Sequence, residues 1–279
     1  MSTATGVGSV RAADAAPAAP LDLPDGVTVG IEYPRYLQPT RGGFEIIMDN
    51  QSDGDLLVTE LQLLSPLFEV EAPTSVDVTI RAGLRNDLRV PFCASVCPPA
   101  EVPTHVVMTI ETDDVTQHGV VEIDPGPVAG VNRTECGALE VAEHANIAFA
   151  DEYRIDDATD TLHATITVSR RAGDDPLSID TVRGTVLYRL EPPEPLAEGD
   201  VMATLEPGEE SIEVPVVLLA ARCEPHAVAD VKKPYDMAVW VTIGDGDTTY
   251  VPLRPSDPVI AGLQELTRRC VADTPPRQE

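Results

Sequence analysis

Cysteine and histidine side chains are the first candidates for chemistry in this sequence, and they come closest together in the run Cys223–His226, CEPH. A thiol beside an imidazole could act as a nucleophile with its general base, or supply half of a metal site. No further acid or base is visibly paired with them, and a nucleophile must be reduced, whereas Cys223 has a candidate disulfide partner. The sequence therefore predicts no catalytic residue, no cofactor and a protein that is not an enzyme. The remaining histidines are scattered without the spacing of metal ligands: His105, His118, His144 and His163.

An acidic run, Asp49–Glu60 (DNQSDGDLLVTE), resembles the calcium loop of an EF-hand. It has an acid at its first position, an acid and a glycine at its fifth and sixth, and a glutamate at its twelfth. Gln51 departs from the pattern at the third position, and the flanking segments read as strands rather than helices. We therefore expect a hairpin turn here and no bound metal.

The loop after Cys223 is the best candidate for an interaction site. The matching loop upstream runs directly to its next strand through PPAEVP, whereas this one adds about two helical turns from Pro225. Long loops on a rigid scaffold often carry binding functions. The alternative is a helical plug that covers the open end of a sandwich. The candidate interaction residues are His226, Asp230, Lys232 and Lys233, which include the only two lysines of the chain.

Two stretches of the chain, Arg89–Pro125 and Glu213–Pro255, repeat each other. A Val-Pro pair, a Cys-Pro corner and two apolar runs follow in the same order, with Val107–Ile110 matching Trp240–Ile243. Upstream, Leu56, Val58 and Leu61 match Leu177, Ile179 and Val182 in spacing. The chain is therefore predicted to be one β-domain duplicated in tandem.

Short apolar runs that alternate with period two and are separated by turn residues predict seven strands in each half. This pattern indicates an all-β protein of two tandem immunoglobulin-like antiparallel β-sandwich domains with a C-terminal α-helix. A strand within Ala138–Phe149 opens the second domain, and Ser178–Leu190 is its third strand. The expected boundaries are a flexible Ala/Pro-rich leader at 1–24, domain 1 at 25–126, a short linker at 125–131, domain 2 at 132–270 and a tail at 271–279.

The C-terminal helix is predicted over 257–270. Ser256 provides an N-cap and Pro258 suits the first turn, while Arg268 and Arg269 suit the negative end of the helix dipole. Ile260, Leu263 and Leu266 form an apolar stripe that can pack on the second sandwich.

The formal net charge of −28 and the pI of about 4.3 disfavour nucleic acid and anionic membranes as partners. No run is apolar and long enough for a transmembrane helix. The N-terminal segment as written lacks the apolar core of a signal peptide. We therefore expect either a cytoplasmic protein or an extracytoplasmic one whose signal lies upstream.

Strand parity predicts the pairing of the five cysteines. With seven strands running up and down, Cys97 lies at the end of domain 1 from which the chain leaves, and Cys136 opens domain 2 at that junction. We predict a Cys97–Cys136 bridge across the domain interface. The same parity puts Cys223 at the outer end of domain 2, within reach of Cys270 on the terminal helix. The rival is a local Cys93–Cys97 bridge that would leave Cys136 free.

The run Arg222–Asp230 (RCEPHAVAD), with Lys232 and Lys233 after it, resembles a loop of uncharacterised exported proteins of GC-rich bacteria. That loop reads R-C-D-P-H-A-x-A-E followed by K-K or K-R, and here Glu224 and Asp230 exchange the two acids. The resemblance implies secretion or lipoprotein anchoring and tandem sandwich domains, and no activity.

The function expected from the sequence is a non-enzymatic, extracytoplasmic interaction or structural module with a protein partner. The alternative is a small-molecule or metal-ion binding protein that uses the 223–234 loop. A hydrolase is the third possibility.

Overall fold

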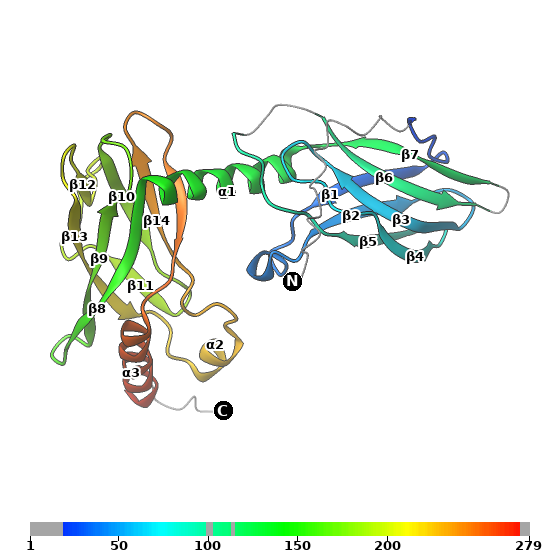
Figure 1. Cartoon of the computed structure of the whole chain (residues 1–279). Helices are drawn as coiled ribbons and strands as arrows, with labels where there is room; N and C mark the ends of the chain where they lie inside the picture. Colours follow the sequence, from blue (N-terminus) through cyan, green and yellow to red (C-terminus); the bar gives the residue numbers. More distant parts are fainter. Residues whose placement is uncertain (1–18, 99–102, 113–114, 274–279) are drawn as a thin grey trace, which may run out of the picture. The chain divides into compact units, whose positions relative to one another are not determined.

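The computed structural model describes residues 19–98, 103–112 and 115–273, and it is mostly β, with 46% strand and 17% helix (Figure 1). The chain divides into two compact units, Met1–Cys136 and Gly137–Glu279, called domain 1 and domain 2 below. Each domain is a sandwich of two antiparallel sheets, which confirms the all-β prediction.

Domain 1 packs a three-stranded sheet against a four-stranded sheet. In spatial order, the first sheet is β1 (Val27–Glu32), β2 (Phe44–Asn50) and β5 (Leu84–Val90). The second is β4 (Thr74–Ile80), β3 (Leu56–Leu64), β6 (Thr104–Glu111) and β7 (Thr116–Ile123). A short 3-10 helix, η2 (Gln38–Thr40), lies between β1 and β2.

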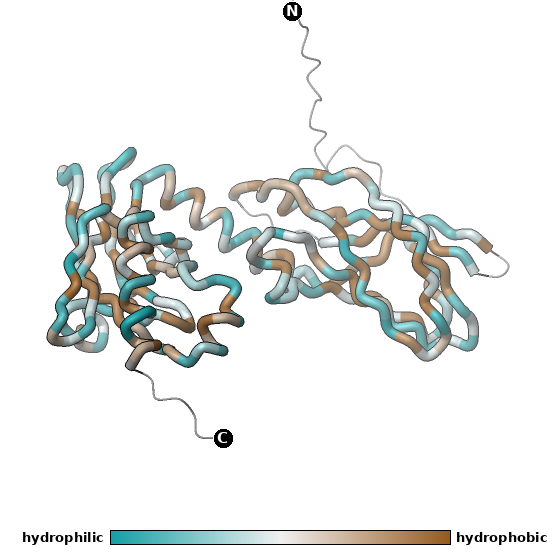
Figure 2. The backbone as a smooth tube through the Cα atoms, turned by 90° about the horizontal axis from the view of Figure 1, so that it is seen from below, coloured by the Kyte–Doolittle hydropathy of each residue, from teal (hydrophilic) through white to brown (hydrophobic). Residues whose placement is uncertain are grey.

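Hydrophobic and hydrophilic residues alternate along the strands because one face of each sheet is turned toward the core (Figure 2). In domain 1 the core is rich in phenylalanine: Phe44, Phe68 and Phe92 are buried, with ring centroids 4.7 Å apart for Phe44 and Phe92 and 4.9 Å for Phe68 and Phe92. Aromatic contacts at these separations add to the free energy gained by burial.

Domain 2 packs two four-stranded sheets. One is β12 (Ala203–Leu205), β10 (Leu177–Arg183), β14 (Met237–Ile243) and β15 (Thr249–Leu253). The other is β11 (Tyr188–Glu191), β13 (Ser211–Ala220), β9 (Thr161–Arg170) and β8 (Ala145–Asp156).

The predicted third strand of domain 2, Ser178–Leu190, is in fact two strands, β10 and β11, which belong to different sheets. The chain turns sharply at Gly184, where an added Cβ would overlap the carbonyl of Tyr188. The Thr185 amide donates to that carbonyl at 2.7 Å and closes the turn. Such close backbone approach requires glycine, and it is not visible in the apolar pattern.

Helix α1 (Gly126–His144) was not predicted, and it replaces both the expected linker and the start of the expected strand in Ala138–Phe149. Pro127 fits the first helical turn, and Asp124 accepts a hydrogen bond from the Gly126 amide at 2.9 Å. The helix runs directly into β8 at Ala145. The division between the two domains therefore falls inside α1, after Cys136, rather than at residues 126–132.

Helix α3 (Asp257–Asp273) agrees with the predicted C-terminal helix. Leu263 and Leu266 lie in the core of domain 2. An added Cβ on Gly262 would be 2.6 Å from Leu162, so the helix backbone lies directly against β9. Figure 1 shows α3 at the end of the sandwich where β8 and β13 terminate.

The end of the expected leader is part of domain 1. Pro20 forms a parallel bridge with Val120 of β7, through 2.9 Å hydrogen bonds that join Leu21 and Ala19 to the Val120 backbone. Gly119 permits this contact, because an added Cβ would lie 2.7 Å from the Ala19 carbonyl oxygen. The segment thus pairs with an edge strand that would otherwise present open hydrogen-bonding groups.

Candidate interaction surface

Cys223 and Cys270 form a disulfide, with Cα atoms 5.5 Å apart, that joins the loop after β13 to α3. The thiol of Cys223 is therefore not available as a nucleophile, and His226, three residues away, is exposed to solvent. Within the residues that the structure describes, no group of three or more histidine, cysteine or acidic side chains could hold a metal ion.

Helix α2 (Pro225–Asp230) begins at the predicted proline and has two different sides. Val228 and, just after the helix, Val231 pack against the core of domain 2. His226, Asp230 and Lys232 are exposed. The loop therefore covers part of the core, as expected of a plug, and leaves charged side chains exposed to solvent.

The end of the α2 loop is attached to domain 2 by several contacts. The Thr185 hydroxyl donates to the Pro234 carbonyl at 3.0 Å. The Tyr235 ring stacks on Tyr188 with centroids 6.0 Å apart, and the Tyr235 hydroxyl accepts a hydrogen bond from Gln264 of α3. Lys233 lies 3.5 Å from Asp236, a half-exposed ion pair that contributes little to stability. The loop is thus held at both ends.

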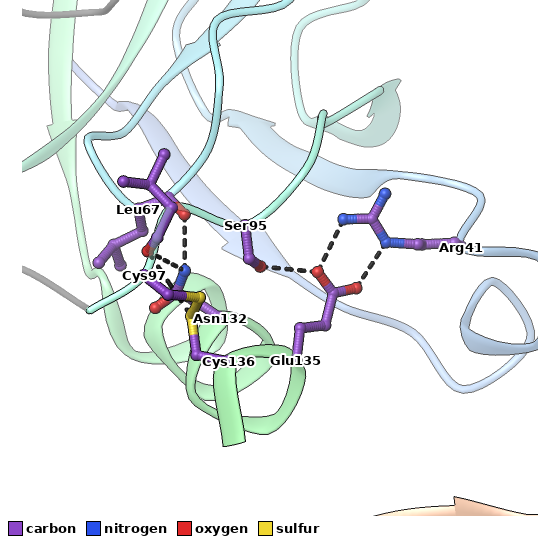
Figure 3. Close-up of a disulfide and its surroundings, with 8 residues drawn as sticks. Arg41, Leu67, Ser95, Cys97, Asn132, Glu135 and Cys136 are labelled. Carbon is purple, nitrogen blue, oxygen red and sulfur yellow. Dashed lines mark hydrogen bonds and ion pairs between the residues drawn. A yellow bond between two sulfur atoms is a disulfide. The ribbon is translucent and has the colours of Figure 1, made fainter. Parts of the chain in front are cut away.

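Cys97 and Cys136 form the other predicted disulfide, with Cα atoms 5.7 Å apart (Figure 3). Cys136 lies in α1 and belongs to domain 1, so the bridge joins the loop after β5 to this helix. The predicted role of this bridge across a domain interface was wrong, because the sequence did not reveal α1.

Arg41 adds a second attachment of α1 to domain 1 (Figure 3). Its guanidinium donates to both carboxylate oxygens of Glu135, at 2.5 and 2.7 Å, and to the Cys93 carbonyl at 2.7 Å. It also lies 4.5 Å from the Phe92 ring centroid. Burial alone would raise the pKa of Glu135, but hydrogen bonds from Arg41 and Ser95 lower it below its ordinary value. Sequence reasoning missed this pair because its members are far apart in the chain.

Asn132 is a fully buried polar residue on the same helix. Its side-chain amide donates to the Leu67 carbonyl at 2.6 Å and to the Val96 carbonyl at 3.2 Å, which satisfies two loop carbonyls at the end of the sandwich (Figure 3). Together with the fully buried Val128, it closes this end of domain 1.

Cys93 is the one free cysteine among the described residues, which rules out the rival Cys93–Cys97 bridge. Its thiol donates to Glu71 at 2.7 Å, and this hydrogen bond, with burial, raises the pKa of Cys93 to about 11. At neutral pH the thiol is protonated and therefore a poor nucleophile.

The acidic run Asp49–Glu60 is not a hairpin turn, because β2 and β3 belong to different sheets. The buried Asn50 organises the connection. Its side-chain oxygen accepts hydrogen bonds from the backbone and hydroxyl of Ser52, and its amide donates to the Gly54 and Ile80 carbonyls at 2.9 Å. The segment crosses from one sheet to the other.

No known protein family matches the sequence, and a search of curated proteins finds no match either. Solved structures with some likeness include red sea bream transglutaminase, at 10% identity over 84% of this chain, with a TM-score of 0.23. This chain spans 32% of the transglutaminase chain. Another is the CsuC–CsuE chaperone–tip adhesion subunit pre-assembly complex from archaic chaperone–usher Csu pili of Acinetobacter baumannii. There the identity is 8%, the coverage 76% of this chain and 91% of that chain, and the TM-score 0.20. Scores this low carry no argument about function.

None of the helices in the described residues is both long enough and apolar enough to cross a membrane.

Proposed function

We propose that this protein is a non-enzymatic interaction or structural module that works outside the cytoplasm. The observation that carries the proposal is a pair of equivalent disulfides. In each sandwich a helix follows the last strand, and a cystine joins that helix to the loop before the next-to-last strand: Cys97–Cys136 in domain 1 and Cys223–Cys270 in domain 2. Structural disulfides of this kind persist in oxidising compartments.

We propose further that both domains are immunoglobulin-like copies of one unit, and that the unit includes the helix. In domain 1 the sheet that contains β1, β2 and β5 faces the sheet that contains β3, β6 and β7. In domain 2 the sheet that contains β8, β9 and β13 faces the sheet that contains β10, β14 and β15, in the same order along the chain. A β-bulge interrupts β3 after Val58 and β10 after Ile179, which the sequence had matched. Val58 pairs with Ile110 and Ile179 pairs with Val241, so Ile110 and Val241 are equivalent positions in the two domains. The match made from the sequence had aligned Ile110 with Ile243, two residues further along.

The α2 loop is the proposed contact surface for a protein partner. It is fixed to the domain at both ends by Cys223 and Tyr235, and its exposed side chains include His226, Asp230 and Lys232. The chain has 47 acidic and 19 basic residues, so the adjacent Lys232 and Lys233 place positive charge on a mostly negative surface. A partner can recognise this difference in charge. The same run supports the proposed relation to exported proteins of GC-rich bacteria.

The experiment is a pull-down from native cell envelope with the whole chain and with the double variant Lys232→Glu, Lys233→Glu. We expect the double variant to lose the partner while its melting temperature stays nearly unchanged, because exposed charge changes shift stability by about 0.5 kcal/mol or less. The matched control reverses a charge elsewhere on domain 2, Arg189→Glu, and should retain the partner.

A large fall in melting temperature for the double variant would instead indicate that the loop is only a plug. Thermal shifts with calcium, zinc and copper ions test the alternative role as a metal-ion binder. Fully free thiols in the protein purified from its native source would contradict the extracytoplasmic location.

A further inference from the structure

The outward face of the sheet β10-β14-β15 carries an unusual set of side chains, which we call the Trp240 face: Ser178, Asp180, Arg183, Trp240, Thr242 and Tyr250. Trp240 and Tyr250 are direct cross-strand neighbours, and their rings meet edge to face with centroids 5.5 Å apart. The Arg183 guanidinium lies 5.2 Å from the Trp240 ring and 5.6 Å from the Tyr250 ring. Inward neighbours such as Val239 and Val241 are buried, so the two aromatic rings stand on the opposite side.

A row of hydroxyl groups lies beside the aromatic pair. Ser178 and Thr242 are cross-strand partners, and they donate to the two carboxylate oxygens of Asp180 at 2.5 and 2.6 Å. Thr248 lies within 3.2 Å of the same carboxylate and 2.9 Å from the Thr242 hydroxyl. A hydroxyl has one proton and two lone pairs, so protons committed to Asp180 leave oxygen acceptors for a ligand.

The charges of this face restrict what it can bind. Asp180 is its one acid, and this carboxylate already accepts several hydroxyl protons. Arg183 forms no salt bridge with any residue in the described part of the chain, so its fork of N–H donors is not committed to a carboxylate. The charges of Asp180 and Arg183 cancel, so this face is close to neutral. The chain as a whole has a net charge of −28, which repels nucleic acid.

The polar residues favour a sugar over a protein. Serine is depleted in protein interfaces, and serine and threonine are rare among the residues that carry their binding energy. Small-ligand sites instead combine aromatic rings with a few hydroxyl and charged groups that fix the orientation of the ligand. A neutral saccharide supplies apolar C–H faces for Trp240 and Tyr250, hydroxyl donors for Ser178 and Thr242, and hydroxyl acceptors for Arg183.

We propose that the Trp240 face is a binding site for a neutral saccharide chain. The open face of a sheet suits an extended ligand that lies along it. The site shares no residue with the α2 loop, and each proposal has its own test, so the failure of one does not decide the other.

Trp240 is the only tryptophan of the chain, so its fluorescence reports directly on this site. The experiment titrates the whole chain with neutral hexasaccharides of glucose, mannose, galactose and N-acetylglucosamine. We expect at least one of them to change Trp240 emission in a saturable way. Affinity electrophoresis in gels that contain the corresponding polysaccharides gives a second measurement that does not depend on the tryptophan.

Three variants make the test specific. Tyr250→Ala should weaken binding by about tenfold, since one aromatic contact is lost. Asp180→Asn should weaken it because one of the two acceptor oxygens becomes an NH2 donor, so the hydroxyl groups must reorient. Tyr153→Ala, which removes a 40% exposed tyrosine from β8, should bind like the native chain. Thermal melting of each variant, followed by circular dichroism, verifies that domain 2 is folded.

Absence of a response to all four sugars by both methods would overturn the proposal. So would saccharide binding that Tyr250→Ala and Asp180→Asn leave unchanged, or binding that requires a charged polysaccharide. Capture of a protein partner through Trp240 without any saccharide response would show that this face is a protein interface instead.

Discussion

Glu135 shows how a single residue attaches a helix to a sandwich. It accepts two hydrogen bonds from Arg41 and one from Ser95, and the helix that carries it has no other ion pair with domain 1 among the described residues. Charge-assisted, bidentate pairs of this kind are stronger than single hydrogen bonds between neutral groups. The free energy that holds α1 to domain 1 should therefore depend on pH.

Because the pKa of Glu135 lies below its ordinary value of 4.5 in the folded protein, its ionised form stabilises the fold. That contribution is fully present above the pKa of the unfolded chain and is lost as the pH falls through the lower folded value. We expect amide protection in the first half of α1 to fall in the native chain as the pH is lowered through and below the ordinary glutamate pKa of 4.5. Hydrogen-exchange mass spectrometry of Glu135→Gln should show lower protection at the higher pH and a weaker pH dependence; an equal dependence in both proteins would contradict this role.

Cys93 provides a second residue-level prediction. The hydrogen bond to Glu71 is the main reason that the pKa of this thiol rises to about 11. In Glu71→Gln the negative charge is gone, so the thiolate fraction at pH 8 should rise and alkylation by iodoacetamide should accelerate about tenfold or more. Glu122→Gln, an exposed change in the same domain, should react at the native rate. An unchanged rate in Glu71→Gln would mean that burial alone protects the thiol.

At the scale of elements, each sandwich is closed at one end by the helix that follows its last strand. In domain 2, α3 contributes Val259, Leu263 and Leu266 to the core, and the Tyr188 hydroxyl reaches the helix at the Leu263 carbonyl, 3.2 Å away. In domain 1, Val128 of α1 is fully buried in the core. A disulfide holds each helix against the loop that it covers.

The disulfide of domain 2 should therefore matter more for stability than any exposed ion pair. Replacing Cys223 and Cys270 by serine removes a cross-link over a sequence separation of 47, worth about 4 kcal/mol in the chain-entropy model. We expect a lower denaturation midpoint for domain 2, followed by Trp240 fluorescence. Cys93→Ser is the matched control and should leave this midpoint unchanged. A double serine variant as stable as the native chain would show that packing alone holds α3.

At the scale of the whole molecule, the boundary between the domains lies within a continuous helix. The sequence placed the end of domain 1 at residue 126, but the buried Val128 and Asn132 and the cystine at Cys136 belong to the same unit. A fragment cut at 126 lacks the helix that closes its end, so apolar surface and loop carbonyls become exposed to water.

We predict that fragment 1–136 folds on its own and that fragment 1–126 melts at a clearly lower temperature or not cooperatively, as measured by circular dichroism. Fragment 1–136 with Cys136→Ser separates the effect of the disulfide from that of packing, and it should melt between the other two. Equal stability of all three fragments would mean that α1 is not part of the folding unit of domain 1.

Most of the strands, the C-terminal helix and both cystine pairs could be predicted from the amino-acid sequence, whereas Ser178–Leu190 was wrongly taken as one strand and α1 was missed. Alternation of apolar residues is a local signal, and so is the stripe of Leu263 and Leu266, so both could be read without a structure. The hydroxyl of Ser256, the predicted N-cap, donates to the Ala150 carbonyl at 3.2 Å. Strand parity predicted that Cys97 pairs with Cys136, but it placed Cys136 at the start of domain 2, whereas this residue lies in α1 and belongs to domain 1.

The nature of α1, and the side chains that meet on a surface, became clear from the three-dimensional structure. The run PGPVAGV has the composition of a linker, and its helix is stabilised by contacts of Asn132 with Leu67 and of Glu135 with Arg41, partners 65 and 94 residues away. The Trp240 face likewise joins residues of three strands that are separate in the chain. Contacts between distant residues, unlike local periodicity, depend on how the sheets pack and leave no pattern in the sequence.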